Sequence, residues 1–205
     1  MLKFNSSQLR TSPVDENIKK SIRKNPIYII CDNVLDTYNV GAIFRLADAV
    51  AAEKVFLCAG TETPPNPKIK KASVNTWDWV EWEYCETAIL AISKIKMLNC
   101  HPESDSDRMK DPVGIKSARD SSRSLRMTSK IMVVSIEQNK KSVPLKDFKP
   151  EFPIALVVGN ETYGVSKEVL DISDEIVELP MYGINTSLNV MVTLGIVLYR
   201  VIEFL

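Results

Sequence analysis

The stretch that most constrains this chain runs from residue 154 to residue 189, where glycines cluster behind two apolar runs. Seven of the 205 residues are glycine, and three of them (Gly159, Gly164 and Gly183) fall here. Glycine reaches positive φ at little cost and lets a ligand approach the backbone, so the clustering indicates shaped loops. The apolar runs IALVV and EIVELPM predict two buried strands that end in these loops. In open α/β sheets, ligands bind at such strand ends.

The amino-terminal half predicts a parallel strand–helix–strand unit. Short apolar runs at 27–31 and 54–58 are typical of buried strands, and apolar residues at helical spacing fill the stretch between them. Two strands joined by a helix of this length pair in parallel. Further strands are expected at 79–84 and 130–136, and a further helix at 86–98. The pattern predicts an α/β fold with a mostly parallel sheet flanked by helices.

The start of the first long helix is a candidate anion site. Asn39 and Gly41 lie near its first turn, and Arg45 follows in its early turns. The first N–H groups of a helix lack partners within the helix and therefore attract negative charge. Taken alone, Asn39 could equally be a cap or loop residue and Arg45 a surface arginine.

The glycine loops lack the marks of the common nucleotide sites. GNETYGVS has the GxxxxG spacing of a phosphate loop, but Val165 stands where that loop requires lysine, and no GxGxxG occurs. The groups that remain are backbone amides and four polar side chains, which suit a polar, nucleoside-like ligand: Asn160, Glu161, Ser187 and Asn189.

Charge is balanced, with 26 basic and 26 acidic residues, so only local patches could attract nucleic acid. Three patches are present: a short helical extension at 1–25, the lysines at 68–71, and the second half of a flexible, serine-rich insertion at 99–129. Each is either solvated surface or a contact to RNA phosphates. The tryptophans either pack in the core or, where exposed, stack on a base: Trp77, Trp79 and Trp82.

Composition argues against several classes of protein. The single histidine, His101, disfavours a histidine metal site and Ser-His-Asp catalysis, and no metal is expected. Four cysteines without a CxxC pair predict buried thiols in a reducing compartment. The first 20 residues lack the apolar core of a signal peptide, and the apolar run at 187–205 carries polar residues that disfavour a membrane span. A cytoplasmic protein is expected.

The same run at 187–205 predicts a homodimer. As a helix it is apolar on nearly every side, and such a helix must be covered on every side. One face can lie on the sheet, and a second copy of the chain can cover the other.

Three segments together resemble the SpoU/TrmH family of RNA methyltransferases, within the SPOUT superfamily. NVGAIFRLADA resembles its motif 1, LVVGNETYGVS its motif 2 and LPMYGINTSLNVMVTLGIVLY its motif 3. The resemblance runs from about Ile27 to the carboxyl terminus, apart from 99–129. It implies transfer of a methyl group from S-adenosylmethionine to a ribose 2′-hydroxyl of tRNA or rRNA. It also implies a domain at 26–205 with a C-terminal deep trefoil knot, and a homodimer through the C-terminal helix.

Residue roles carried over by motif position follow from this resemblance. The catalytic residues would be Arg45, Asn39, Glu161, Ser187 and Asn189. The cofactor would be held by Gly159, Asn160, Glu161, Leu179, Met181, Gly183, Ser187, Leu188 and Asn189. A guanidinium with a pKa above about 12 is a poor base. We therefore expect Arg45 to bind a neighbouring phosphate and to stabilise the developing alkoxide.

Two alternatives from other classes stay open. One is a non-catalytic RNA-binding relative that kept the fold. The other is a nucleotide-binding regulatory protein unrelated to RNA. The sequence names neither the RNA nor the nucleotide.

Overall fold

The computed structural model of the chain describes residues 4–5, 8–9, 14–100 and 130–205. Most of the predicted insertion at 99–129 lies outside these residues. Of the predicted extension at 1–25, the structure describes one helix, α2 (Glu16–Ser21), which Asp15 caps by accepting from the Asn17 N–H.

The described residues form a sheet of seven strands in the order β3-β2-β1-β6-β4-β7-β5, and neighbouring strands pair in parallel. This confirms the predicted parallel α/β sheet. β3 begins at Trp82 rather than at residue 79, because residues 76–78 form a 3₁₀ turn, η1 (Thr76–Asp78). The other strands are β1 (Asn25–Asp32), β2 (Ala52–Cys58), β4 (Met132–Ile136), β5 (Val143–Pro144), β6 (Ile154–Val158) and β7 (Glu175–Glu178).

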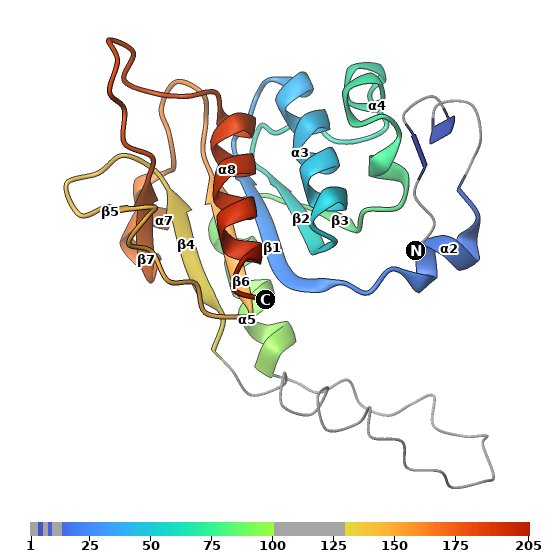
Figure 1. Cartoon of the computed structure of the whole chain (residues 1–205), viewed down its shortest axis with the longest axis horizontal. Helices are drawn as coiled ribbons and strands as arrows, with labels where there is room; N and C mark the ends of the chain where they lie inside the picture. Colours follow the sequence, from blue (N-terminus) through green and yellow to red (C-terminus); the bar gives the residue numbers. More distant parts are fainter. Residues whose placement is uncertain (1–3, 6–7, 10–13, 101–129) are drawn as a thin grey trace, which may run out of the picture.

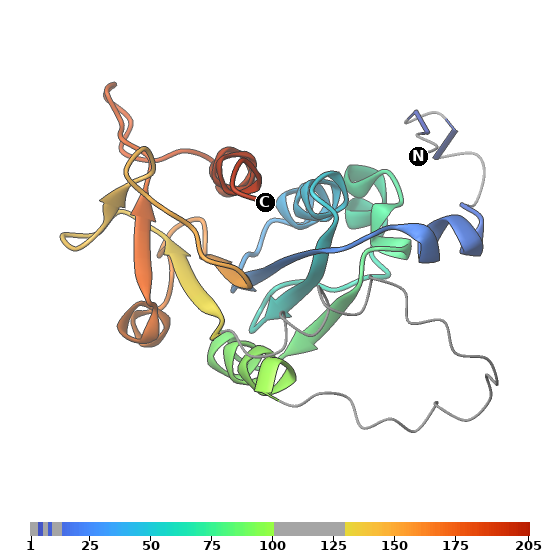
Figure 2. The same ribbon diagram turned by 60° about the horizontal axis from the view of Figure 1, so that its bottom comes forward.

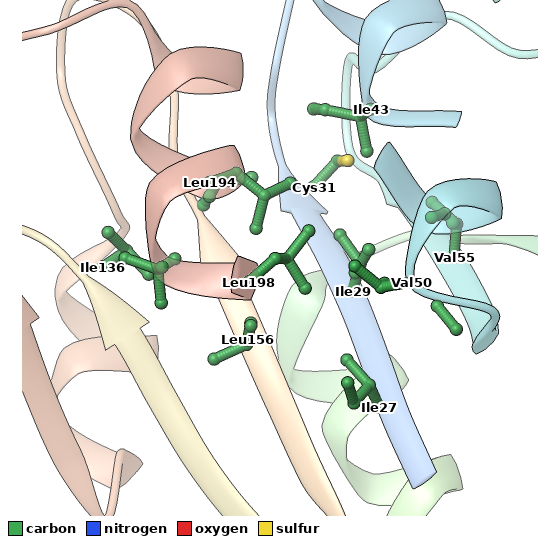
Figure 3. Close-up of a cluster of buried hydrophobic side chains, with 14 of the residues drawn as sticks. Ile27, Ile29, Cys31, Ile43, Val50, Val55, Ile136, Leu156, Leu194 and Leu198 are labelled. Carbon is green, nitrogen blue, oxygen red and sulfur yellow. The ribbon is translucent and has the colours of Figure 1, made fainter. Parts of the chain in front are cut away.

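Helices cover both faces of the sheet (Figures 1 and 2). One face carries α3 (Thr37–Ala49), α4 (Pro67–Ser73) and α8 (Val190–Ile202), and the other carries α5 (Ala88–Cys100) and α7 (Lys167–Ile172). The central strands are therefore buried on both sides, and every residue of β6 is buried. Figure 3 shows Leu194 and Leu198 of α8 over Leu156, beside Ile29 of β1.

Helix α8 is only half covered within one chain. Leu194, Val197, Leu198 and Val201 are buried against the sheet and α3. The opposite stripe stays exposed, with Val192 at 41%, Ile196 at 43% and Tyr199 at 54%. The predicted all-round apolar helix is thus a helix with one buried apolar face and one exposed apolar stripe.

Gly41 has a packing role inside α3, which differs from the predicted place at a helix mouth. It is buried where α3 crosses α4, and a Cβ there would lie 2.5 Å from the Ala72 Cβ and 2.8 Å from the Ile69 carbonyl oxygen. Glycine is required because the two helices approach too closely for any side chain.

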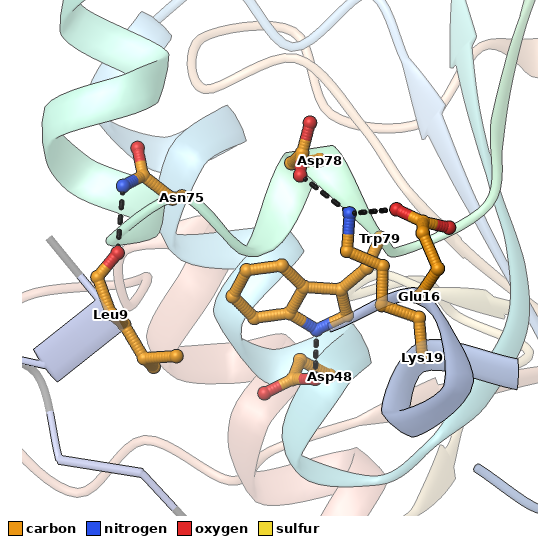
Figure 4. A network of polar contacts seen from close by, with 7 residues as sticks. All are labelled: Leu9, Glu16, Lys19, Asp48, Asn75, Asp78 and Trp79. Carbon is orange, nitrogen blue, oxygen red and sulfur yellow. Dashed lines mark hydrogen bonds and ion pairs between the residues drawn. The ribbon is translucent and has the colours of Figure 1, made fainter. Parts of the chain in front are cut away.

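The amino-terminal helix is tied to the core by polar contacts (Figure 4). Lys19 Nζ lies 2.8 Å from Glu16 and 2.9 Å from Asp78 of η1. Next to Asp78, the indole Nε1 of Trp79 donates to Asp48 Oδ1 of α3 at 2.7 Å, which ties η1 to α3. Lys19 is therefore already paired. Trp77 and Trp79 pack against the core, which is the first of the two roles predicted for the tryptophans.

The carboxyl ends of β1 and β6 form the switch point of the sheet. β1 leads into α3 on one face, whereas β6 leads into α7 on the other. Adjacent strands whose connections leave on opposite faces open a crevice at their carboxyl ends, and this is where open α/β sheets bind ligands.

Candidate functional site

The loop after β6 is a tight turn that only glycine permits. Asn160 and Gly164 exchange backbone hydrogen bonds of 3.0 and 2.9 Å, and the Asn160 side chain accepts from the Thr162 and Tyr163 N–H groups. A Cβ on Gly159 would lie 2.1 Å from the Gly164 carbonyl carbon. Gly164 itself has φ of +71°. The clustered glycines of this loop therefore shape its backbone.

Glu161, at the tip of this loop, reaches across to the start of α3. Its carboxylate accepts from the backbone N–H groups of Leu35 and Asp36, both at 3.1 Å, and from Asn39 Nδ2 at 3.0 Å. Burial alone would raise the pKa of this carboxyl, but the hydrogen bonds from Asn39 and the backbone outweigh it and lower the pKa. The predicted anion site at the start of α3 thus receives a carboxylate of the protein itself.

Asn39 carries the same network on to α8. Its Oδ1 accepts from Asn189 Nδ2 at 3.0 Å, and Asn189 Oδ1 in turn caps α8 by accepting from the Met191 N–H at 2.9 Å. Glu161, Asn39 and Asn189 come from three segments that are far apart in the sequence. The structure joins them in one hydrogen-bonded chain.

A cavity of about 580 Å³ opens beside this chain, a size typical of small-molecule sites. It is lined by the ends of β4, β6 and β7 and by the segment that leads into α8. Eight of the nine residues predicted to hold the cofactor line it: Gly159, Asn160, Glu161, Leu179, Met181, Ser187, Leu188 and Asn189. Gly183 is not among the lining residues. It lies in the exposed segment between β7 and α8, which projects from the body of the sheet (Figure 1).

Arg45 is the one predicted catalytic residue that this arrangement does not include. It lies on α3, six residues after Asn39, with an exposed side chain that makes no hydrogen bond or ion pair to the rest of the described chain. It does not line the cavity. Its place at a reaction centre stays a prediction.

Glu137 is a lining residue that the sequence reasoning missed. Its Oε2 accepts from the Val165 N–H at 2.9 Å, and its Oε1 accepts from the Gln138 N–H at 2.8 Å. Glu137 therefore braces the far side of the glycine loop. Its position directly after the predicted strand at 130–136 was an available signal, because carboxyl ends of parallel strands meet at one edge.

Other chemistry finds little support in the described residues. Across 4–5, 8–9, 14–100 and 130–205, no group of three or more His, Cys, Asp or Glu could hold a metal. Cys31, Cys58 and Cys85 are buried free thiols, as predicted, and burial raises the pKa of each. No helix in the described part of the chain has the length and apolarity needed to cross a membrane.

Comparison with known proteins decides the family. Residues 26–199 match the SpoU rRNA Methylase family. The chain belongs to this family. The match covers all three predicted motif segments, so the predicted resemblance is confirmed.

Curated relatives of this SpoU family chain include two enzymes with named activities. The tRNA (guanosine(18)-2′-O)-methyltransferase of Aquifex aeolicus is 29% identical over 180 residues, which are 87% of this chain and 69% of the relative. The 23S rRNA (guanosine-2′-O-)-methyltransferase RlmB of Haemophilus influenzae is 25% identical over 198 residues, or 97% of this chain and 67% of the relative. The chain thus spans about two thirds of the length of these relatives.

Solved structures share the fold. The SpoU methyltransferase AviRb of Streptomyces viridochromogenes, in complex with the cofactor AdoMet, superposes with a TM-score of 0.67 at 20% identity. That match covers 93% of this chain and 65% of AviRb. The A. aeolicus TrmH/SpoU tRNA modifying enzyme gives 0.66 at 24% identity, over 97% of this chain and 81% of that one.

Two of the glycines predicted to hold the cofactor, Gly159 in the cavity wall and Gly183 outside it, should respond differently to one added methyl group. Gly159→Ala forces a Cβ into the backbone of Gly164, so we expect it to lower the free energy of unfolding by about 3 kcal/mol. Gly183→Ala is the matched control, because nothing lies within 4 Å of its Cβ position. We expect a change below about 0.5 kcal/mol there, since it is an exposed position away from such contacts. Urea unfolding followed by circular dichroism measures both, and equal effects would contradict the assignment.

Proposed function

We propose that this protein transfers a methyl group from S-adenosylmethionine to a ribose 2′-hydroxyl of tRNA or rRNA. The observation that carries the proposal is the cavity lined by the second and third motif segments of a SpoU family chain, beside the hydrogen bonds that join both segments to Asn39 of the first. The relatives named above methylate guanosine 2′-oxygens in tRNA or 23S rRNA, and AviRb binds AdoMet in its crystal. The two alternatives, a non-catalytic relative and a regulatory protein, have no such support.

The cavity has groups that suit an adenosyl cofactor. Leu179, Met181 and Leu188 offer apolar surface for a purine ring, and Ser187, Asn189 and backbone amides offer hydrogen bonds for its polar parts. S-adenosylmethionine would supply a methyl group activated by a positively charged sulfur. With the leaving group so activated, holding the 2′-oxygen in line with the methyl carbon contributes up to roughly 7–11 kcal/mol.

The role proposed for Arg45 is electrostatic. Its exposed guanidinium would bind an RNA phosphate and stabilise the alkoxide that forms as the hydroxyl loses its proton to a phosphate or water. Asn39 and Glu161 would hold the start of α3, and thus Arg45, in position relative to the cavity.

The finer architecture is also proposed from family membership. Residues 26–205 would form the catalytic domain of a cytoplasmic enzyme, with residues 99–129 as an RNA-binding insertion and the segment at 179–189 within a deep trefoil knot. A crystal structure in which 179–189 passes outside the neighbouring loop would contradict the knot. Unchanged RNA affinity after deletion of 104–128 would contradict the role of the insertion.

Arg45→Lys tests the proposed chemistry. Lysine keeps the charge but loses the two-pronged contact to phosphate, so we expect methyl transfer from tritiated S-adenosylmethionine to bulk tRNA and rRNA to fall about 100-fold. Cofactor affinity, measured by calorimetry, should stay unchanged. Lys146→Arg, at an exposed basic residue outside the motifs and the three basic patches, is the control and should retain full activity. Near-normal turnover of Arg45→Lys would refute the role, and a wild-type chain that binds no S-adenosylmethionine would refute the function.

We further propose a homodimer through α8. Val192, Ile196 and Tyr199 form an exposed apolar stripe along the helix, and α3 beside it adds the exposed Leu35 and Tyr38 near its start. An apolar stripe of this kind is typical of a buried interface.

Ile196→Glu tests the dimer. A carboxylate in the centre of the stripe would be buried without a partner, so we expect the variant to sediment as a monomer where the wild type sediments as a dimer. Leu90→Glu on α5 is matched in exposure, at 46% against 43%, and should leave the dimer intact. A monomeric wild type, or a dimeric Ile196→Glu with native circular dichroism, would contradict the interface.

A further inference from the structure

A second pocket lies at the same edge of the sheet, away from the candidate cofactor site. It is an open pocket of about 480 Å³, lined by the loop at 59–63 together with Trp82 and Tyr84 of β3. The two aromatic residues are two apart on an edge strand, so their side chains stand on the same face of the sheet. None of its residues lines the candidate cofactor cavity.

The aromatic surface in this pocket is held in place and left open. Tyr84 is 47% exposed, and its hydroxyl donates to the Ala59 carbonyl oxygen at 3.2 Å, which fixes the ring against the loop. Trp82 packs partly against the core, so its ring is also restrained. A fixed, exposed aromatic face is the surface on which a nucleic-acid base stacks.

The charges around the pocket favour a base over a phosphate as its occupant. Glu62 lines the pocket and is exposed, and its carboxylate would repel a phosphate but can accept a hydrogen bond from the amino group of a base. Four residues beyond the loop begins α4, whose exposed Lys68, Lys70 and Lys71 have no ion-pair partner in the described part of the chain. The lysines of α4 outside the pocket and Glu62 inside it suit a nucleotide whose phosphate backbone lies over α4 and whose base lies in the pocket.

Hydrogen bonds through Asn33 also connect this pocket to the candidate cofactor site. Gly60 N–H donates to Asn33 Oδ1 at 3.1 Å, and the Asn33 carbonyl oxygen accepts from Asn160 Nδ2 at 2.9 Å. Thr61 Oγ1 likewise accepts from the Val34 N–H at 2.9 Å. Three strand spacings separate β6 from β3, about 14 Å in all. One RNA strand could therefore engage both sites.

We propose that the pocket of Trp82, Tyr84 and Glu62 binds an unpaired base of the RNA substrate that neighbours the methylated nucleotide. The inference rests on the proposed function, because it names a contact to the RNA on which that function acts. An arginine side chain of a protein partner could also stack on Tyr84 beside Glu62. The unpaired lysines of α4 favour a polyanion over a basic protein surface.

Binding of labelled single-stranded RNA tests the pocket. The full chain is titrated into fluorescein-labelled oligocytidine and oligouridine at fixed salt, with affinity read from fluorescence anisotropy. Tyr84→Ala should weaken binding of both oligomers roughly 5- to 150-fold, because it removes the stacking surface. Tyr84→Phe, which keeps the ring but loses the hydrogen bond to Ala59, should weaken binding less than Tyr84→Ala does. Leu90→Ala, of equal exposure on the opposite face of the sheet, is the control and should have no effect.

A second variant, Glu62→Gln, tests the proposed hydrogen bond between the base and the Glu62 carboxylate. Wild type should prefer oligocytidine, whose amino group donates to the Glu62 carboxylate, and Glu62→Gln should narrow that preference. All variants should keep wild-type affinity for S-adenosylmethionine. Unchanged RNA binding by Tyr84→Ala would contradict base binding by this pocket but would not affect the proposed methyl transfer. Binding of an arginine hexapeptide through Tyr84, with no RNA binding, would overturn it in favour of a protein partner.

Discussion

The hydrogen bonds of the Glu161 carboxylate organise the rest of the candidate site. Two backbone N–H groups and the Asn39 amide converge on it, so a single side chain fixes both the tip of the glycine loop and the start of α3. Because Asn39 also receives the Asn189 amide, the same contact sets the start of α8. Hydrogen bonds to a charged group contribute about 1.5–3 kcal/mol each when buried, and less at an exposed carboxylate.

The sheet explains why these segments can meet at all. At the switch point between β1 and β6, the connections after adjacent strands leave on opposite faces, and the cavity opens on the β6 side of that point, over the ends of β4, β6 and β7. Asn33, just past β1, bonds to Gly60 on one side and to Asn160 on the other. The carboxyl edge thus works as one rigid platform that carries two pockets, a cofactor pocket over β4, β6 and β7 and an aromatic pocket beside β3.

Local sequence patterns predicted much of this edge of the sheet. The features that they missed depend on contacts between residues far apart in the sequence. Apolar periodicity indicated β1, β2, β6 and α3, and the second and third motif segments indicated eight residues that line the cavity. The packing role of Gly41 could not be predicted, because its neighbour Ala72 is 31 residues away on α4. Glu137 acts through the distant Val165 N–H, and the pocket at Tyr84 depends on a loop that ends 21 residues earlier. Such contacts appear only once the sheet order is known.

The pH dependence of stability in Glu161→Gln tests the central claim most directly. Since the native contacts lower the pKa of Glu161, its stabilisation is present above the ordinary value near 4.5 and is lost as pH falls through the lower native value. In urea unfolding, wild type should exceed Glu161→Gln by about 1 kcal/mol at pH 7, and the gap should close below about pH 4.5. Glu86→Gln, an exposed acid on the loop before α5, should show no gap. A gap that is absent, or that stays constant down to pH 3, would contradict a carboxylate that holds the three segments together.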